Sequence, residues 1–391
     1  MDSARRHQFG SHAMRRIMNS VLRLRNTLVP MAVIGLSVTS PELVAGSDVV
    51  SHVVARDRQA AAAVHWSREK IAKAPAMVLP VDRGKAPVSV APDYEDARAA
   101  MGSAPAGAPD GDADRVAQMA YWMDWAALED DGSAYVEADP VPLGSSGVFT
   151  YFDVNVKTAL WKLTPHKWVG KFTLTAPTGD RSCSATAISG NNIVTAAHCV
   201  YDTPSRNQFY TNMAFTPAYR NGAAPYGTFA VTSCSVLTAW KNLSGAYTIS
   251  GWAKSDVAVC AVRANSAGQG LNQAVGFAGR RWDADYLQLA FTSGYPAQTY
   301  TTATISNGPA QYLRACIAET FQYATDTLGV GCYWGAGISG SGWLVDYKPQ
   351  VDSGANFVNS VVSGGFIGEP NVFGARFTRN NIVVLCNARG C

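Results

Sequence analysis

The sequence is poor in several features that mark common classes of protein. Charged residues make up only 16% of the chain, and its net charge of +3 is scattered, whereas a nucleic-acid-binding domain needs clustered Lys and Arg. No apolar run approaches the roughly 20 residues that a transmembrane helix requires. The cysteines show none of the Cys/His spacings that hold zinc. We therefore expect no nucleic-acid partner, no membrane span in the mature protein, no metal and no cofactor.

Cysteine is absent from the first 182 residues, and all eight cysteines lie between Cys183 and Cys391. An even number confined to one segment is typical of a disulfide framework formed in an oxidising compartment. Apolar residues make up 47% of the chain, which is enough for a sizeable core and too many for a largely disordered protein. The composition therefore indicates a globular, disulfide-bonded protein.

The N-terminal stretch has the pattern of an export signal. Six arginines within the first 25 residues precede an apolar run from Leu28 to Val38, which is too short to span a bilayer. We predict a signal peptide over residues 1–46 and an extracellular, secreted protein.

Residues 47–146 differ in composition from the rest of the chain. They lack cysteine and are rich in Ala and Pro, and Ser103–Asp112 resembles a linker. Two stretches, His65–Lys73 and Val116–Leu128, are candidates for amphipathic helices. We interpret the segment as a partly disordered propeptide of a zymogen, which would block a cleft or delay folding if it inhibits. The alternative is a flexible linker without a role.

The remaining residues, 147–391, alternate short β-type runs with Gly, Pro, Asn and Ser. Val169–Leu174, Val257–Val262 and Gly342–Val345 are examples. Short strands at such spacing indicate a β-sandwich or barrel, and about 245 residues suit two packed barrels. We predict an all-β fold with almost no helix except near the C-terminus.

This region has only two histidines, His166 and His198. A lone histidine is more often structural than catalytic. His198, however, follows a predicted strand, and two cysteines that are 16 residues apart, Cys183 and Cys199, bracket that strand. A disulfide between them would limit the movement of the ring, which favours a role as a general base.

Asp256 opens an apolar strand, Asp256–Val262, so its carboxylate should lie at the edge of the core. A buried carboxylate is costly unless it accepts hydrogen bonds. An imidazole N–H is a suitable donor, and the bond would leave the second ring nitrogen free to take a proton. Alone, an Asp before a strand is usually a cap or turn residue.

Ser339 lies in a glycine-rich loop, Gly337-Ile338-Ser339-Gly340. A serine hydroxyl becomes a nucleophile only when a base removes its proton and N–H groups await the oxyanion. Glycine permits the backbone conformations that point successive N–H groups inward. Such loops are also common as simple turns.

The chain order His198, Asp256, Ser339 is that of the chymotrypsin-type triad. Residues 160–385 resemble the secreted trypsin-like (chymotrypsin-fold) serine peptidases of bacterial and fungal type. Thr195–Cys199 matches the histidine motif TAAHC of that family, the segment DVAV at Asp256 resembles its DIAL motif, and GISGSG around Ser339 resembles GDSGGP.

The resemblance implies two packed six-stranded antiparallel β-barrels and a monomeric serine endopeptidase that acts on polypeptides through an acyl-enzyme. Ser339 would be the nucleophile, His198 the base and then the acid, and Asp256 the residue that orients the imidazole. The N–H groups of Gly337 and Ser339 would form the oxyanion hole. The substrate backbone would pair, strand to strand, with Ser363, Gly364 and Gly365.

Two positions depart from the family pattern. Ile338 replaces an Asp that pairs with a newly freed N-terminus during activation, so that route is closed. Gly342 replaces a Pro, which we expect to loosen the exit of the loop. In the specificity pocket, Tyr333 replaces the acid of trypsin-type enzymes, and Val362 replaces the histidine of glutamate-specific ones. Both charged preferences are disfavoured, which leaves an apolar, aromatic or small substrate side chain.

Eight cysteines allow 105 connectivities. We expect Cys183–Cys199 from the arrangement around His198. A bond between residues 316 and 332 would brace the loop that enters the nucleophile, and one between residues 386 and 391 would close a short C-terminal loop. Residues 234 and 260 remain by elimination. The expected pairs are Cys183–Cys199, Cys316–Cys332, Cys386–Cys391 and Cys234–Cys260.

Two other functions stay open at this point. Ile338 and Gly342 suggest a catalytically impaired secreted relative that acts as a binding protein through the old cleft. A structural or cell-wall β-protein with a coincidental triad is the third possibility, and wide separation of His198 from Ser339 would favour it.

Overall fold

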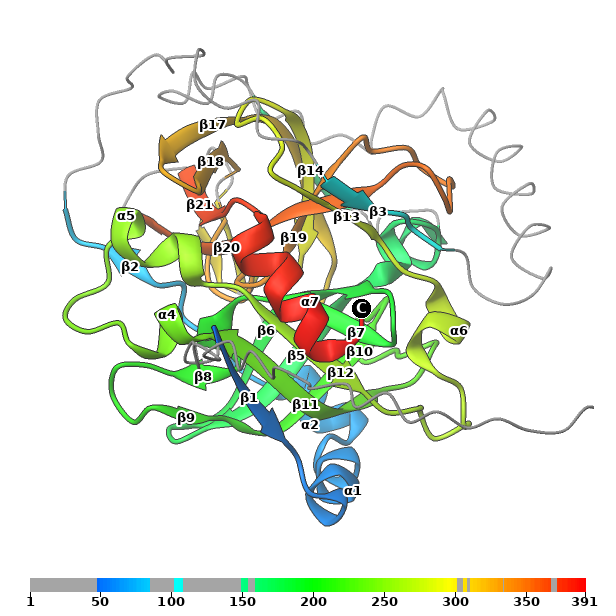
Figure 1. Cartoon of the computed structure of the whole chain (residues 1–391). Helices are drawn as coiled ribbons and strands as arrows, with labels where there is room; N and C mark the ends of the chain where they lie inside the picture. Colours follow the sequence, from blue (N-terminus) through cyan, green and yellow to red (C-terminus); the bar gives the residue numbers. More distant parts are fainter. Residues whose placement is uncertain are drawn as a thin grey trace, which may run out of the picture. The chain divides into compact units, whose positions relative to one another are not determined.

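The computed structural model describes residues 48–84, 102–107, 149–153, 159–300, 305–307, 310–332, 334–366 and 371–391. Two β-barrels make up most of this part of the chain (Figure 1). The predicted signal peptide and the candidate helix at Val116–Leu128 lie outside the described residues. Within the described residues, no helix is long and apolar enough to cross a membrane.

The first barrel is a closed ring of six antiparallel strands. It closes because β11 pairs with β10 through one part of its length and with β12 on its other side. Its strands, in the order of the ring, are β5 (Val169–Ala176), β6 (Gly179–Ile188), β7 (Asn192–Thr195), β12 (Ala258–Val262), β11 (Phe229–Leu237) and β10 (Thr211–Pro217).

The alternating pattern of β5 shows how the sequence builds this barrel. Phe172 and Leu174 are two residues apart, so they point to the same side of the strand, and both are fully buried in the larger hydrophobic core. Cys183 in β6 lies directly opposite Phe172 in the strand register. Side chains from neighbouring strands therefore fill the interior of the barrel.

The second barrel is also a closed ring of six strands, because β19 pairs with both β14 and β20. A separate apolar cluster, which includes Trp343, Val362 and Val372, packs within it. Its strands, in the order of the ring, are β14 (Leu289–Gly294), β17 (Arg314–Ala324), β18 (Thr327–Gly331), β21 (Asn371–Ala375), β20 (Phe357–Phe366) and β19 (Gly342–Val345).

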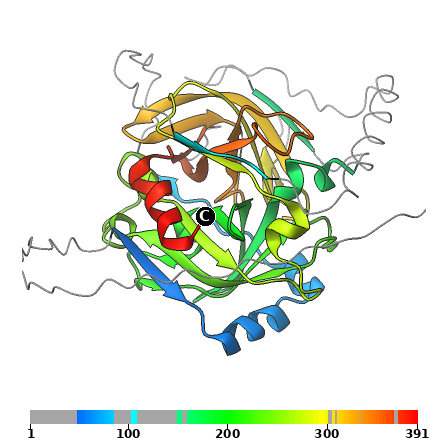
Figure 2. The same ribbon diagram turned by 45° about the vertical axis from the view of Figure 1, so that its right-hand side comes forward.

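The predicted all-β fold with two six-stranded antiparallel barrels is confirmed. The helices are short, and the C-terminal one, α7 (Val384–Arg389), packs on β11 and β12 after the π-helical turn η6 (Arg379–Val383) (Figure 2). The other short helices of the barrel region are α4 (Thr238–Lys241), α5 (Ile249–Trp252), α6 (Leu271–Val275), and the 3₁₀ turns η2 (Ala159–Lys162), η3 (His166–Trp168), η4 (Ala197–Cys199) and η5 (Ala253–Ser255).

The described part of residues 47–146 packs on both barrels. Its first strand pairs with β11, and its second strand pairs with β20 in parallel. Its elements are β1 (Val49–Val53), α1 (Arg56–His65), α2 (Arg68–Lys73), β2 (Val81–Asp82) and β3 (Gly102–Ala104). The expected helical stretch at His65–Lys73 is thus the end of α1 and all of α2. The role of the segment as a propeptide stays a prediction.

The remaining strands extend the barrels or form small hairpins. The parallel strand β13 joins β20 to β3, and β4 adds to β17. These strands are β4 (Phe149–Asp153), β8 (Tyr201–Asp202), β9 (Gln208–Phe209), β13 (Gly279–Trp282), β15 (Gln298–Tyr300) and β16 (Ile305–Asn307).

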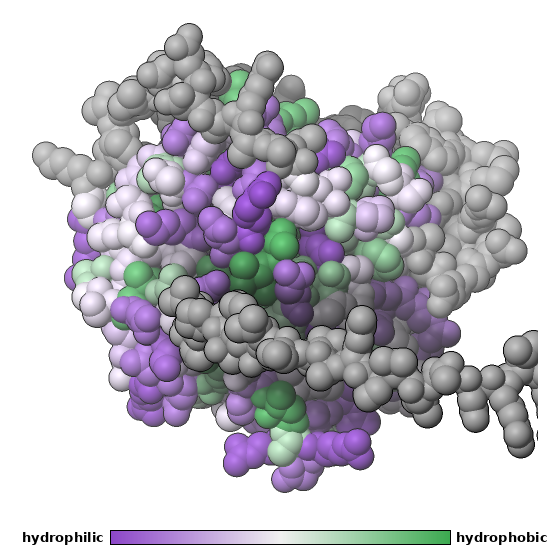
Figure 3. All heavy atoms as spheres, in the orientation of Figure 1, coloured by the Kyte–Doolittle hydropathy of each residue, from purple (hydrophilic) through white to green (hydrophobic). Residues whose placement is uncertain are grey.

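All four expected disulfides are present, and no cysteine is free: Cys183–Cys199, Cys234–Cys260, Cys316–Cys332 and Cys386–Cys391. On the face drawn in Figure 3, apolar side chains form small groups among polar ones. The large apolar residues that are exposed in the described structure are scattered: Val53, Val64, Val78, Leu287 and Leu289.

Candidate active site

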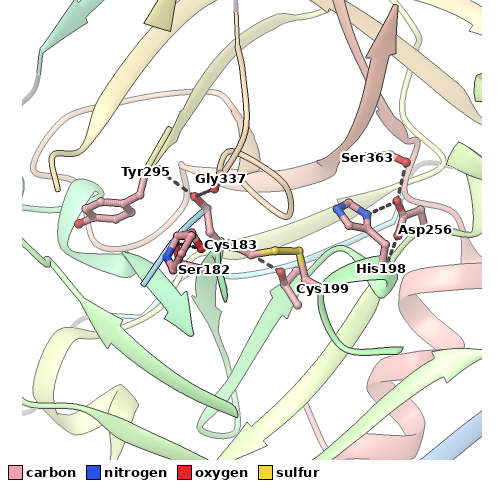
Figure 4. Close-up of a disulfide and its surroundings, with 11 residues drawn as sticks. Ser182, Cys183, His198, Cys199, Asp256, Tyr295, Gly337 and Ser363 are labelled. Carbon is pink, nitrogen blue, oxygen red and sulfur yellow. Dashed lines mark hydrogen bonds and ion pairs between the residues drawn. A yellow bond between two sulfur atoms is a disulfide. The ribbon is translucent and has the colours of Figure 1, made fainter. Parts of the chain in front are cut away.

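His198 lies just beyond the end of a strand of the first barrel. β7 ends at Thr195, and His198 sits in the single turn η4 that follows. The adjacent Cys199 is bonded to Cys183 in β6, so this turn is cross-linked to the neighbouring strand (Figure 4). The disulfide therefore anchors the turn that carries the imidazole.

Asp256 faces His198 because it precedes β12, the strand that pairs with β7. Asp256 is fully buried. Its Oδ2 accepts the Nδ1–H of His198 at 2.7 Å, and its Oδ1 accepts the backbone N–H of His198 at 2.9 Å (Figure 4). A carboxylate can only accept, so Nδ1 is the protonated nitrogen. The other nitrogen, Nε2, is left free to take a proton.

Two hydroxyl groups extend this hydrogen-bonded series. Ser363 in β20 donates to Asp256 Oδ2 at 2.6 Å, and the Tyr247 hydroxyl lies 2.9 Å from Ser363 Oγ. Because the one proton of Ser363 is directed at Asp256, Tyr247 is the donor in the second bond. Burial, with the Asp256 charge nearby, raises the pKa of the Tyr247 phenol well above its usual range. The phenol therefore stays protonated and able to donate.

Tyr247 was not among the residues predicted from the sequence. This residue lies in the loop between α4 and α5, which no family motif covers. The only signal was an aromatic residue in the segment that leads to Asp256. Ser363 was expected to pair with the substrate backbone, which stays a prediction, and its side chain also joins the two barrels at Asp256.

The loop of Ser339 lies against the end of the strand that leads to His198. The N–H of Ser184 in β6 donates to the carbonyl of Ser339 at 2.8 Å. Gly340 has a φ of +80°, and a Cβ on it would lie 2.0 Å from Thr195 Oγ1 and 2.8 Å from the nitrogen of Ala196. Only glycine permits this approach. Ser339, from the second barrel, is thus brought to the part of the first barrel that carries His198.

Ser339 Oγ and His198 Nε2 are both buried, and neither has a hydrogen-bond partner among the described residues. One is a hydroxyl that can donate, and the other is the nitrogen left free by Asp256. Several other buried polar atoms of the described residues also lack a partner, so the chemistry of these two atoms, rather than their lack of a partner, distinguishes them. The pair is therefore available to bond to each other or to a bound molecule.

The two departures from the family pattern have structural explanations. Ile338 is fully buried in the apolar cluster of the second barrel, where a charged residue would need a partner. Gly342 begins β19 opposite Val361, and a Cβ on it would lie 2.7 Å from Thr186 Oγ1. The loop therefore leaves the site directly into a paired strand, and the loosening expected from Gly342 stays a prediction.

The other expected site residues lie around Ser339. The N–H of Gly337 points away from its loop and donates to the carbonyl of Met77 at 3.0 Å. Ser363, Gly364 and Gly365 lie in the last part of β20, beyond Val361, where β19 no longer pairs with it. Tyr333 lies outside the described residues.

One cluster among the described residues has metal-ligand geometry, formed by Cys183, His198 and Cys199. Both sulfur atoms belong to a disulfide, and a metal ion needs free thiolates. Surface cavities of about 460 and 450 Å³ lie beside Tyr347 and Trp66, and neither is lined by His198, Asp256 or Ser339.

Two closed barrels, with His198 and Asp256 on the first and the Ser339 loop on the second, decide the architecture. The chain has the chymotrypsin-like fold. No protein-family model matches the chain, and a comparison with curated proteins also finds no match.

Among solved structures, this chymotrypsin-like chain is similar to three proteases at low identity. The protease Anisep from Arthrobacter nicotinovorans is 24% identical, with a TM-score of 0.46 over 57% of this chain and 95% of that one. The thermostable serine protease AL20 from an extremophilic microorganism is 23% identical, with a TM-score of 0.45 over 57% and 97%. A Glu endopeptidase is 19% identical, with a TM-score of 0.47 over 64% and 100%. The strand pairing described above, rather than these partial overlaps, establishes the fold.

Proposed function

We propose that the chain is a secreted serine endopeptidase that hydrolyses peptide bonds through an acyl-enzyme. The observation that carries this proposal is the buried bond between Asp256 Oδ2 and His198 Nδ1. It sets the tautomer in which Nε2 is a base, next to the loop of a buried serine with an unpaired hydroxyl.

In this mechanism, His198 Nε2 takes the proton of Ser339 as its Oγ attacks the carbonyl carbon of the substrate. Asp256 stabilises the imidazolium that forms, and the Ser363 hydroxyl holds the carboxylate in place. His198 then protonates the leaving amine. In the second half of the reaction, His198 takes a proton from a water molecule, which attacks the acyl group, and then returns the proton to Ser339.

The tetrahedral oxyanion would be held by the N–H groups of Gly337 and Ser339. The Gly337 N–H already holds a carbonyl oxygen, that of Met77, which supports its role as a donor to substrate. The substrate would add to the edge of β20 at Ser363–Gly365, which β19 leaves unpaired, as an antiparallel strand.

Other parts of the proposal rest on the chain as a whole. The four disulfides support secretion, because such bonds persist in oxidising compartments. The alternative, an impaired relative that acts as a binding protein, stays open, because the packing of Ile338 and the pairing of Gly342 do not test catalysis. The monomeric state and the propeptide role of residues 47–146 remain expectations.

Hydrolysis of a peptide library tests the proposal. We expect cleavage by the active form of the chain and its loss in Ser339→Ala. Ser341→Ala is the matched control, because Ser341 lies in the same loop and donates its hydroxyl to the Ser293 carbonyl instead. Equal cleavage by wild type and Ser339→Ala, or no cleavage by any folded form of the chain, would reject the proposal.

A further inference from the structure

Residues 74–82, which we call the cleft segment, pass over the site from the first barrel to the second. At the first barrel, the N–H of Ser182 donates to the Pro75 carbonyl and the N–H of Met77 donates to the Ser182 carbonyl, both at 2.7 Å. These bonds form a parallel bridge between Ala76 and Ser182. Ser182 is adjacent to Cys183, which is bonded to the neighbour of His198.

The middle of the cleft segment is hydrogen-bonded to an N–H group of the proposed oxyanion hole. The Met77 carbonyl accepts the N–H of Gly337 at 3.0 Å, and this is the N–H that a substrate carbonyl would need. Ser339 is fully buried in this arrangement. A nucleophile that no solvent reaches cannot meet an incoming substrate, so the described conformation is closed.

The end of the cleft segment covers the edge of β20 where a substrate would pair. The N–H of Gly365 donates to the Pro80 carbonyl at 3.0 Å, and β2 pairs in parallel with Gly365 and Phe366. In Figure 1, β2 is light blue and lies beside β20. The Asp82 carboxylate then accepts the N–H of Ile249 at 2.9 Å, which anchors this end.

Leu79 points into the second barrel, whereas its neighbour Val78 points to solvent. Leu79 is 9% exposed and packs with the cluster that includes Val362 and Val372, while Val78 is 74% exposed. A Cβ on Gly365 would lie 3.5 Å from Leu79 Cδ2, so this side chain lies beside the strand proposed to bind substrate. The apolar cluster therefore accommodates a branched aliphatic side chain here, and we call the space that Leu79 fills its pocket.

We propose that the cleft segment is an intramolecular inhibitor that lies in the site in the direction opposite to a substrate, with Leu79 in the position of a substrate side chain. This inference rests on the proposed function and adds its regulation. A substrate would run antiparallel to β20, whereas β2 runs parallel to it. In a reversed peptide, the nitrogen and the Cα exchange sides of the carbonyl carbon, so His198 has no leaving amine to protonate. The segment therefore blocks the site without being cleaved.

In the active form, residues 74–82 must therefore leave the site. The space that Leu79 then vacates indicates which substrate side chain binds there. We expect the open enzyme to prefer an aliphatic side chain such as Leu in the pocket that Leu79 vacates. This preference agrees with the absence of a charged partner at Val362, which is fully buried among apolar residues.

Labelling of the full chain by a fluorophosphonate probe tests the inhibitor. We expect Leu79→Asp to label at least ~10-fold faster than wild type, because it removes a buried apolar contact and places a charge in an apolar pocket. Val78→Asp is the matched control and should label at the wild-type rate, since Val78 is exposed. Wild type that labels as fast as Leu79→Asp would overturn the inhibitor and leave the proposed function standing.

A second measurement covers the case in which Leu79→Asp fails to fold. A site for a specific protease is inserted between residues 107 and 149 of the wild-type chain, and the chain is cut there after folding. The cut chain, diluted so that its N-terminal piece dissociates, should label faster, and a synthetic peptide of residues 74–82 should slow it again. A peptide with Asp in place of Leu79 should not. If neither peptide slowed labelling, the inhibitor proposal would be rejected. If no form of the chain were labelled, the serine-peptidase function itself would be rejected.

Discussion

Asp256→Asn tests the hydrogen-bond arrangement of the site in detail. In the structure, Asp256 Oδ1 accepts the backbone N–H of His198, and Oδ2 accepts both His198 Nδ1–H and the Ser363 hydroxyl. An amide NH₂ in the Oδ1 position would face the backbone N–H, and two opposed buried donors would cost about 1–3 kcal/mol. The NH₂ group of the Asn side chain therefore takes the Oδ2 position.

With NH₂ in that position, the imidazole must present an acceptor to it. Nδ1 of His198 loses its proton, and Nε2 gains one, so Nε2 can no longer take the proton of Ser339. We expect kcat to fall ~10⁴-fold, which corresponds to about 5.5 kcal/mol in the activation free energy. The Ser363 hydroxyl can rotate to accept, so the fold should be retained.

The assay is steady-state peptide hydrolysis in the chain opened by Leu79→Asp, with urea unfolding to check the fold. Asp283→Asn is a control, because Asp283 is a buried acid whose carboxylate binds Arg379 and not the site. A loss of less than tenfold in a folded Asp256→Asn enzyme would refute the reasoning.

Three further predictions concern stability. Ile338→Asp should lower the unfolding free energy by about 3 kcal/mol or more in urea denaturation, against about 1 kcal/mol for Ile338→Val, because a buried charge has no partner there; equal losses would contradict this. Burial lowers the pKa of Lys171 to about 7 and that of His166 to about 3. Between the folded and unfolded pKa values of each group, the unfolded chain binds more protons than the folded chain. The free energy of unfolding should therefore rise with pH between pH 7 and 10.5, because of Lys171, and between pH 3 and 6.5, because of His166. Lys171→Met should remove only the upper slope, and an unchanged slope would be evidence against the assignment. Replacing Cys183 and Cys199 by Ala should lower the free energy of unfolding by about 3 kcal/mol, since the bond closes a loop of 16 residues. An unchanged urea-denaturation midpoint would contradict this prediction.

The proposed catalytic residues were predictable because the proposed roles demand particular residue types in a fixed chain order. His198, beside a cysteine that could be cross-linked across a strand, and Asp256, at the start of an apolar strand, were placed by such arguments, and the structure pairs them at 2.7 Å. The two-barrel fold followed from short alternating strands and the length of the region. Local pattern left a sandwich or a barrel open, and the resemblance to chymotrypsin-fold peptidases supplied the two six-stranded barrels and the roles of the three residues.

The cleft segment and Tyr247 were beyond the reach of local pattern. Residues 74–82 contain two prolines and an apolar stretch without regular periodicity, which indicates a linker when seen alone. Their partners Ser182, Gly337 and Gly365 lie more than 100 residues further along the chain. Tyr247 meets Ser363 across 116 residues. Only the tertiary structure brings such residues together.

Ile338 shows a different kind of gap between sequence and structure. The sequence indicated a missing ion pair, which raised the prospect of an impaired enzyme. The structure shows a fully buried apolar side chain inside the second barrel. The sequence did not reveal which apolar neighbours would surround this side chain.

The most direct test of the central claim is to map the fluorophosphonate adduct by mass spectrometry on the chain opened by Leu79→Asp. We predict one adduct per chain, on Ser339, whose formation is strongly slowed by His198→Ala. An adduct on a different residue, or a folded chain that carries none, would contradict the account.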